Sequence, residues 1–156
     1  MTILVVGLGN ILLRDEGIGV RVIEALQHRG DLPAGIELVD GGTSAMDLLD
    51  TLAQAEHLII IDAVRGGRAP GSLVRIAGDA VPAFFQTKLS PHQVGLSDVL
   101  ATLRLMEQEP KTVVVLGCEP ETLETGLELS PTVAAQVDPL CRMALTEVAA
   151  LVAGAG

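Results

Sequence analysis

The sequence predicts an α/β fold: a single three-layer domain over residues 1–156, with a mostly parallel five-stranded sheet between helices on both faces. Two observations predict it. Short apolar runs alternate with segments whose apolar residues recur at helical spacing, which is typical of repeated strand–helix units. Apolar residues form 49% of the chain and charged residues 19%, which favours a packed core over disorder.

Five apolar runs are expected to form the strands, at residues 3–6, 36–39, 58–61, 72–76 and 112–116. The third run is apolar throughout, which indicates burial on both faces and a central place in the sheet. The fourth is shorter and carries Arg75, which suits an edge strand. The sheet can therefore hold one antiparallel strand at its edge and otherwise be parallel.

Helices are expected at residues 16–29, 96–107 and from 131 onward, and a further one after the second strand carries Met46, Leu48, Leu49 and Leu52. Gly30 is expected to end the first helix, and Thr43 or Ser44 to cap the second. Pro131, which follows a serine, is typical of a first helical position. Pro139 is expected to kink the last helix or to divide it in two.

The composition restricts the partners and the location. A net charge of −10 argues against nucleic acid and against a membrane surface, because both select clustered Lys and Arg. Cys118 and Cys141 are too few for a disulfide framework, so a reducing cytoplasm is expected. No basic signal precedes the first strand, and no apolar run reaches the roughly 20 residues that span a bilayer.

Carboxylates stand where three of the expected strands end. Asp15 and Glu16 follow the first strand, Asp40 the second and Asp62 the third. Because the carboxyl ends of parallel strands share one edge, these side chains can converge. His92, in a loop before the third helix, is expected to return to the same edge. Two carboxylates and an imidazole suit a divalent metal such as zinc, nickel, iron or manganese.

Each of these residues also has a simpler interpretation. Glu16 can complement a helix dipole, and Asp40, which two glycines follow, can serve a turn. His92 beside a proline can be an ordinary surface histidine. Asp62 favours a function more strongly, because a carboxylate that closes so apolar a strand is costly unless it is paired.

The glycine-rich opening could also indicate a dinucleotide site. That fingerprint needs a third glycine three residues after the second, where this chain has Leu12. The charges of Asp15 and Glu16 would repel a pyrophosphate. The HExxH, GxSxG and GxxxxGK[ST] signatures are also missing, so any hydrolysis is expected to use a metal or a carboxylate as general base.

Four segments of the chain resemble the nickel–iron hydrogenase maturation endopeptidases: GLGNILLRDEGIGVRVIEAL, LVDGGTSAMDLL, HLIIIDAV and KLSPHQVGLSDVL. The resemblance runs from Met1 to about Ala150, so the whole chain is expected to be one domain of that kind. It implies a protease that removes a short C-terminal extension from the precursor of a hydrogenase large subunit, its expected partner, once nickel is in place. The cut falls just after a metal-binding motif that ends in a basic residue.

The resemblance also implies roles for single residues. Glu16, Asp62 and His92 correspond to the nickel ligands, and the substrate-handling segment corresponds to Asp40, Gly41, Gly42 and Thr43. Nickel is expected to arrive with the substrate, and cadmium or zinc to replace it in vitro. Glu16, Asp62 and Asp40 are the catalytic candidates; the attacking group stays open among a coordinated water, a carboxylate-activated water and Asp40 itself. The alternative is a non-catalytic nickel-binding maturation chaperone.

Overall fold

The computed structural model describes residues 1–30, 32–82 and 91–155, with the backbone alone for 91–95 and 155. The five strands are β1 (Ile3–Leu8), β2 (Ile36–Gly42), β3 (His57–Ala63), β4 (Leu73–Ala77) and β5 (Thr112–Cys118). The helices are η1 (Arg14–Gly17), α1 (Ile18–Arg29), η2 (Ala45–Leu48), α2 (Leu49–Ala53), α4 (Pro91–Leu105), α5 (Pro131–Ala134) and α6 (Val137–Ala155).

The strands form one sheet in the order β2-β1-β3-β5-β4. The first four in this order pair in parallel, and β4 pairs antiparallel with β5 at the edge. The α/β fold, the mostly parallel five-stranded sheet, its antiparallel edge strand and the central third strand are therefore confirmed.

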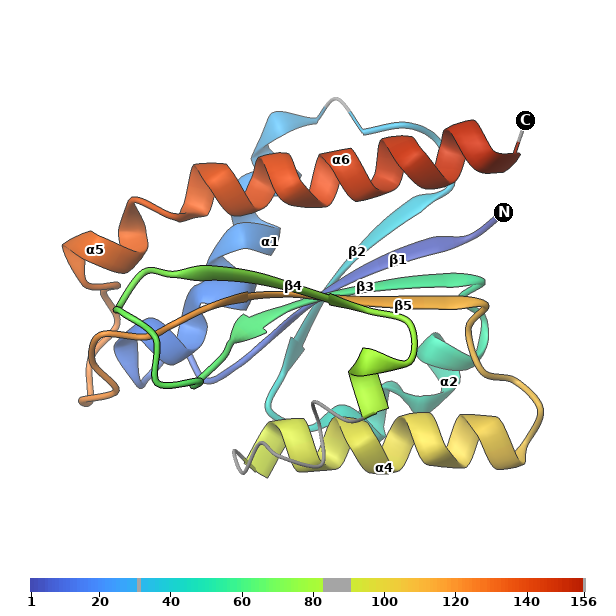
Figure 1. Ribbon diagram of the computed structural model, residues 1–156, viewed down its shortest axis with the longest axis horizontal. Coiled ribbons are helices and arrows are strands. Elements are labelled where there is room, and N and C mark those ends of the chain that lie inside the picture. The colour runs from blue at the N-terminus through green and yellow to red at the C-terminus, as the bar shows by residue number, and fades with distance from the viewer. Residues whose placement is uncertain (31, 83–90, 156) are drawn as a thin grey trace.

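Helices cover both faces of the sheet, as Figure 1 shows, with α1 and α6 on one side and α2 and α4 on the other. The core divides in the same way, because successive side chains of a strand point to opposite faces. In β3, Ile59 and Ile61 pack in the cluster that includes α1 and α6. Leu58 and Ile60 pack in the cluster that includes α2 and α4. None of the helices in the described residues combines the length and apolar character that a bilayer crossing requires.

The boundaries at the carboxyl ends of the strands differ from the sequence expectation. β1, β2, β3 and β5 each run two or three residues further, to Leu8, Gly42, Ala63 and Cys118, so Asp62 lies inside β3 and not after it. The expected ends were placed where the apolar runs stop, but the ladders continue through the following small and polar residues. The first helix begins with the 3-10 turn η1, and Gly30 ends α1 in a left-handed conformation, as expected.

Two expectations about the helices need correction, one about the start of α4 and one about the break in the last helix. His92 lies in the first turn of α4 and not in a loop, because the helix begins five residues earlier than expected, at Pro91. Proline suits a first helical position, since its φ is already helical and its missing N–H is not needed there. The last helix is divided as expected, but between α5 and α6 and thus before Pro139, which lies in the first turn of α6.

The second helical segment also starts differently. Ser44 precedes η2, yet its side chain makes no capping hydrogen bond there. Ser44 thus holds the expected N-cap position, but without the expected side-chain hydrogen bond. The chain leaves β2 through a 3-10 turn before α2 begins, so the first turn of that segment is not an α-helical one.

Candidate active site

Strand pairing brings the segments of Asp40 and Asp62 to one edge of the sheet. Gly7 in β1 pairs with Asp40 of β2 on one side and with Ile61 of β3 on the other. Neighbouring strands lie about 4.8 Å apart, so the backbones at Asp40 and Ile61 are about 10 Å apart. Asp62 follows Ile61 directly. The two aspartates thus flank the carboxyl end of β1.

Glycines let the segment that carries Glu16 pack against these strand ends. A Cβ at Gly9, whose φ is +130°, would lie 1.9 Å from the carbonyl oxygen of Glu16. A Cβ at Gly19 would lie 2.1 Å from the carbonyl oxygen of Ile61. No real side chain tolerates such distances, so only glycine permits this packing. These glycines therefore permit the close approach of η1 and the start of α1 to the strands, and η1 contacts β3.

Asp62 is buried near the end of a central strand, with 2% of its surface exposed. Alternation along β3 puts it on the same face as Leu58 and Ile60, which pack in the cluster that contains Leu96 of α4. Asp62 therefore stands on the face of the sheet that α4 covers.

His92 lies in the first turn of that same helix. The end of α4 leads to the amino end of β5, so the start of α4 lies toward the opposite, carboxyl edge of the sheet. The side chain of His92 is outside the described residues. Among the side chains that are described, no three histidine, cysteine, aspartate or glutamate residues form a group able to hold a metal ion. The site of Glu16, Asp62 and His92 therefore stays a prediction.

The DGGT segment ends β2 and turns away from the sheet. Asp40 and Thr43 are exposed, and Gly41 and Gly42 are partly buried. One carboxylate oxygen of Asp40, Oδ1, accepts a hydrogen bond from the Gly42 N–H at 3.0 Å. This is the turn chemistry of the simpler interpretation, and it leaves Oδ2 of Asp40 on the exposed edge. The role of this segment in substrate handling stays a prediction.

Asp15, adjacent to Glu16, is a buried anchor that sequence reasoning had grouped with the site carboxylates. It is 0% exposed and accepts hydrogen bonds from the backbone N–H groups of Glu121, Thr122 and Ser130 and from the Ser130 hydroxyl, at 2.7–3.0 Å. Burial by itself would raise the pKa of Asp15, but these hydrogen bonds outweigh it and hold the pKa below its usual value. The carboxylate is therefore ionised and fixed.

Glu119 is a second buried anchor, directly after β5. It is 8% exposed, and its carboxylate accepts hydrogen bonds from the Gly66 N–H at 2.8 Å and the Arg68 N–H at 3.0 Å. It thereby holds the loop after β3. The signal was present in the sequence, since Glu119 comes after an apolar run just as Asp62 does.

Arginines add further ties between the start of the chain and the loop after β5. The Arg14 Nε donates to the carbonyl of Glu128 at 3.0 Å, and an Arg21 guanidinium N–H donates to that of Leu127 at 3.0 Å. Together with Asp15, they fix residues 121–130 against η1 and α1.

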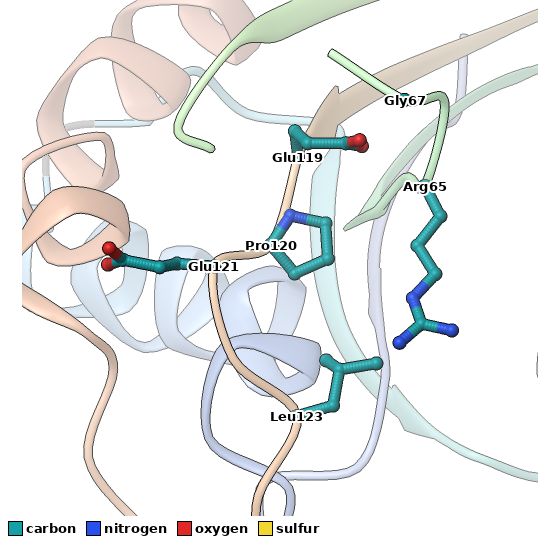
Figure 2. Close-up of a pocket in the computed structure, with 6 residues that line it drawn as sticks. All are labelled: Arg65, Gly67, Glu119, Pro120, Glu121 and Leu123. Carbon is teal, nitrogen blue, oxygen red and sulfur yellow. The ribbon is translucent and has the colours of Figure 1, made fainter. Parts of the chain in front are cut away.

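A pocket of about 290 Å³ opens between the loops that follow β3 and β5. Its lining residues are Arg65, Gly67, Glu119, Pro120, Glu121 and Leu123. Figure 2 shows Arg65 facing Pro120 and Leu123 across the opening. The Glu119 carboxylate points to the Gly67 loop, and that of Glu121 points to the side away from Arg65. The pocket is thus lined by charged side chains of both signs together with Pro120 and Leu123.

Comparison with known sequences gives consistent matches. A family model described as hydrogenase maturation protease matches residues 20–147. The hydrogenase 2 maturation protease of Escherichia coli K12 is 48% identical over 93% of this chain and 89% of that protein. The hydrogenase expression/formation protein HupD of Rhodobacter capsulatus is 45% identical over 95% of this chain and 71% of that protein.

Solved structures agree with these matches. The hydrogenase maturating endopeptidase HybD from E. coli superposes with a TM-score of 0.91 and 47% identity, over 95% of this chain and 92% of that one. The [NiFe] hydrogenase maturation protease HybD from Thermococcus kodakarensis gives a TM-score of 0.80 and 25% identity, over 94% of this chain and 98% of that one.

Proposed function

Since this chain belongs to the hydrogenase maturation protease family and is therefore a peptidase, we propose that it removes the C-terminal extension of a nickel–iron hydrogenase large-subunit precursor. The cut follows nickel insertion, and the nickel of the precursor takes part in recognition. The reaction belongs to the cytoplasm, where the free thiols of Cys118 and Cys141 stay reduced.

The packing of η1 against the carboxyl end of β3 carries this proposal. The contact supports it because Glu16 belongs to η1 and the buried Asp62 belongs to β3, while His92 lies in the first turn of α4, which covers the face of Asp62. Two carboxylates and an imidazole are donors that suit nickel, and also the cadmium or zinc that would replace it in vitro. In this proposal, Glu16, Asp62 and His92 bind the metal that the precursor carries.

The cleavage step itself needs a group that activates the attacking oxygen. A carboxylate takes a proton from water as the water oxygen attacks the scissile carbonyl, and the proton then passes to the leaving amine. Glu16, Asp62 and Asp40 are the candidate carboxylates for this role. Asp40, with Gly41, Gly42 and Thr43, would also contact the precursor peptide, because this segment lies at the exposed end of β2.

The direct test is incubation of the purified protein with nickel-loaded and nickel-free precursor, with the mass of the large subunit as readout. Loss of a defined C-terminal tail from the loaded precursor alone is expected. Equal cleavage of both would defeat nickel recognition and leave the peptidase assignment intact. Metal binding without any shortening of the precursor would instead favour the chaperone.

Substitutions test the proposed site residues. Glu16→Gln, Asp62→Asn and His92→Ala should each abolish processing while the thermal midpoint stays close to that of the wild type. Glu124→Gln, an exposed carboxylate that does not line the pocket, is the matched control and should process normally. A site variant that unfolds at the assay temperature would identify its residue as structural.

A further inference from the structure

We infer that the outer edge of β2 binds the C-terminal extension of the precursor as an added antiparallel strand. The extension pairs through its backbone with residues 36–40 and carries a basic side chain opposite Glu37. This inference rests on the proposed function, to which it adds the surface that recognises the part of the precursor that is removed.

The backbone groups on the outer side of β2 are available for such pairing. The Ile3 N–H of β1 donates to the Gly35 carbonyl at 3.1 Å, which fixes the direction of the backbone groups along β2. Because that direction alternates, every second residue points its N–H and C=O groups away from the sheet; these residues are Ile36, Leu38 and Asp40. No group in the described part of the chain bonds to them on that side. Open edges of this kind are where extended peptides add a strand.

The two edges of the sheet differ in how they are protected. β4, at the other edge, has five residues, and its Arg75 forms an ion pair with Glu147 of α6. Such a charge on a short strand disfavours strand addition. β2 has seven residues and contains no lysine, arginine or proline. Its Ile36 and Leu38 on one face and its Val39 on the other are only partly buried, so an added strand would cover apolar surface on both faces.

Charge selects the occupant of this edge. The side chains of Glu37 and Asp40 are exposed, and neither forms an ion pair with another described residue. A second copy of this chain would bring the same carboxylates close to each other, at a net charge of −10 per molecule, which is unfavourable. A strand with lysine or arginine opposite Glu37 would gain an ion pair instead. The edge therefore suits an extended basic peptide better than a second copy.

The place of β2 in the sheet sets the direction and the reach of the peptide. An added strand would lie three strand spacings from β3, which is about 14 Å, and about four extended residues cross that distance. Because the extension begins at the cut near Asp62, it would pass Asp40 first and run antiparallel to β2. Regular pairing of β2 stops at Asp40, where its ladder with β1 has a bulge. An extension of about nine residues would therefore reach Ile36.

Amide hydrogen exchange of the wild-type protein, resolved by residue with NMR, tests the pairing without cleavage. The probe is a synthetic peptide with the sequence of the precursor's C-terminal extension. In the free protein, the N–H groups of Leu38 and Asp40 should exchange fast and those of Glu37 and Val39 slowly, because only the latter bond to β1. At ten times its Kd, the peptide should slow the exchange of Leu38 and Asp40 about tenfold.

Steady-state processing of nickel-loaded precursor tests whether the pairing is used. Leu38→Pro removes an outward N–H and keeps the ladder with β1, since edge strands tolerate proline there. Glu37→Lys reverses the exposed charge and keeps the test valid if Leu38→Pro does not fold, which thermal melting reports. Both should raise KM about five- to tenfold with kcat nearly unchanged. Glu109→Lys, the same charge reversal in the exposed loop before β5, is the control and should match wild type. Changing the basic residues of the extension to Glu should restore KM with Glu37→Lys.

The possible failures can be separated. If wild type shortens the precursor, but the peptide leaves the β2 amides unprotected and Glu37→Lys matches Glu109→Lys in KM, the pairing is wrong and the proposed function stands. If wild type does not shorten the precursor, but the peptide protects Leu38 and Asp40, the proposed function fails and the pairing is upheld. If these amides are protected without peptide and lose protection on dilution, a second copy occupies the edge, and the inference is overturned.

Discussion

Replacement of Asp15 by Asn should destabilise the protein severely although it changes one atom. The Asp15 Oδ1 accepts the Ser130 N–H at 2.7 Å, and Oδ2 accepts the N–H groups of Glu121 and Thr122 and the Ser130 hydroxyl. Asparagine has one carbonyl oxygen. In either orientation its NH₂ group faces at least one backbone N–H, which then has no acceptor.

The magnitude follows from these contacts. A buried donor left unsatisfied costs about 1–3 kcal/mol, and the remaining hydrogen bonds lose their charge-assisted share. We expect a loss of about 3 kcal/mol in the free energy of unfolding for Asp15→Asn. For a domain of this size, that corresponds to a fall of about 6–12 °C in the melting midpoint. Thermal unfolding at neutral pH, followed by circular dichroism, measures it.

The control and the pH dependence sharpen this test. Glu121→Gln changes an exposed carboxylate in the same loop and keeps the backbone N–H to Asp15, so it should melt within about 2 °C of wild type. The pKa of Asp15 is lowered in the fold, so its contribution is complete above the unfolded-state pKa and is lost as pH falls through the folded-state pKa. The gap between wild type and Asp15→Asn should therefore close in strong acid. If Asp15→Asn and the control melted at the same temperature at neutral pH, the proposed stabilising role of Asp15 would be refuted.

Two further outcomes are expected. Gly19→Ala should cost about 3 kcal/mol or more, or prevent folding, because its Cβ would lie 2.1 Å from the carbonyl oxygen of Ile61. Gly154→Ala, also in a helix but with nothing within 4 Å of its Cβ, controls for the substitution itself and should not destabilise the protein. Chemical denaturation of both variants measures the difference. Burial raises the pKa of the Cys118 thiol to about 11 and also raises that of Cys141, so native protein should react slowly with a thiol reagent at pH 8 and rapidly once unfolded. Rapid labelling of the native state would contradict this burial.

The fold could be predicted from the sequence because the patterns that indicate strands and helices are local. Apolar runs marked all five strands, and a single arginine, Arg75, marked the edge strand. The ends of the strands were harder to predict, since the hydrogen bonds between strands continue through residues such as Asp40 and Gly42 that have no strand preference. The early start of α4 at Pro91 was missed for a different reason: Pro91 was assigned to a loop, although proline also suits the first position of a helix.

The site was harder to predict, because the roles of its carboxylates depend on distant partners. Asp15 and Glu16 are adjacent and look equivalent in the sequence. The structure makes Asp15 an internal anchor whose partners lie 106–115 residues further along the chain. No local pattern contains that information. Glu119, in contrast, had the same signal as Asp62, a carboxylate after an apolar run, and the sequence argument did not extend to it.

The hydrogen bonds of Asp15 affect the order in which the parts of the protein fold during synthesis. Asp15, next to Glu16, leaves the ribosome 106–115 residues ahead of the groups that hold it, at residues 121–130. Contacts between residues this far apart form late in folding, because closing the long loop between them costs conformational entropy. The nascent chain can thus form β1 and α1 early, whereas the segment around Asp15 and Glu16 gains its final shape only when residues 121–130 have emerged.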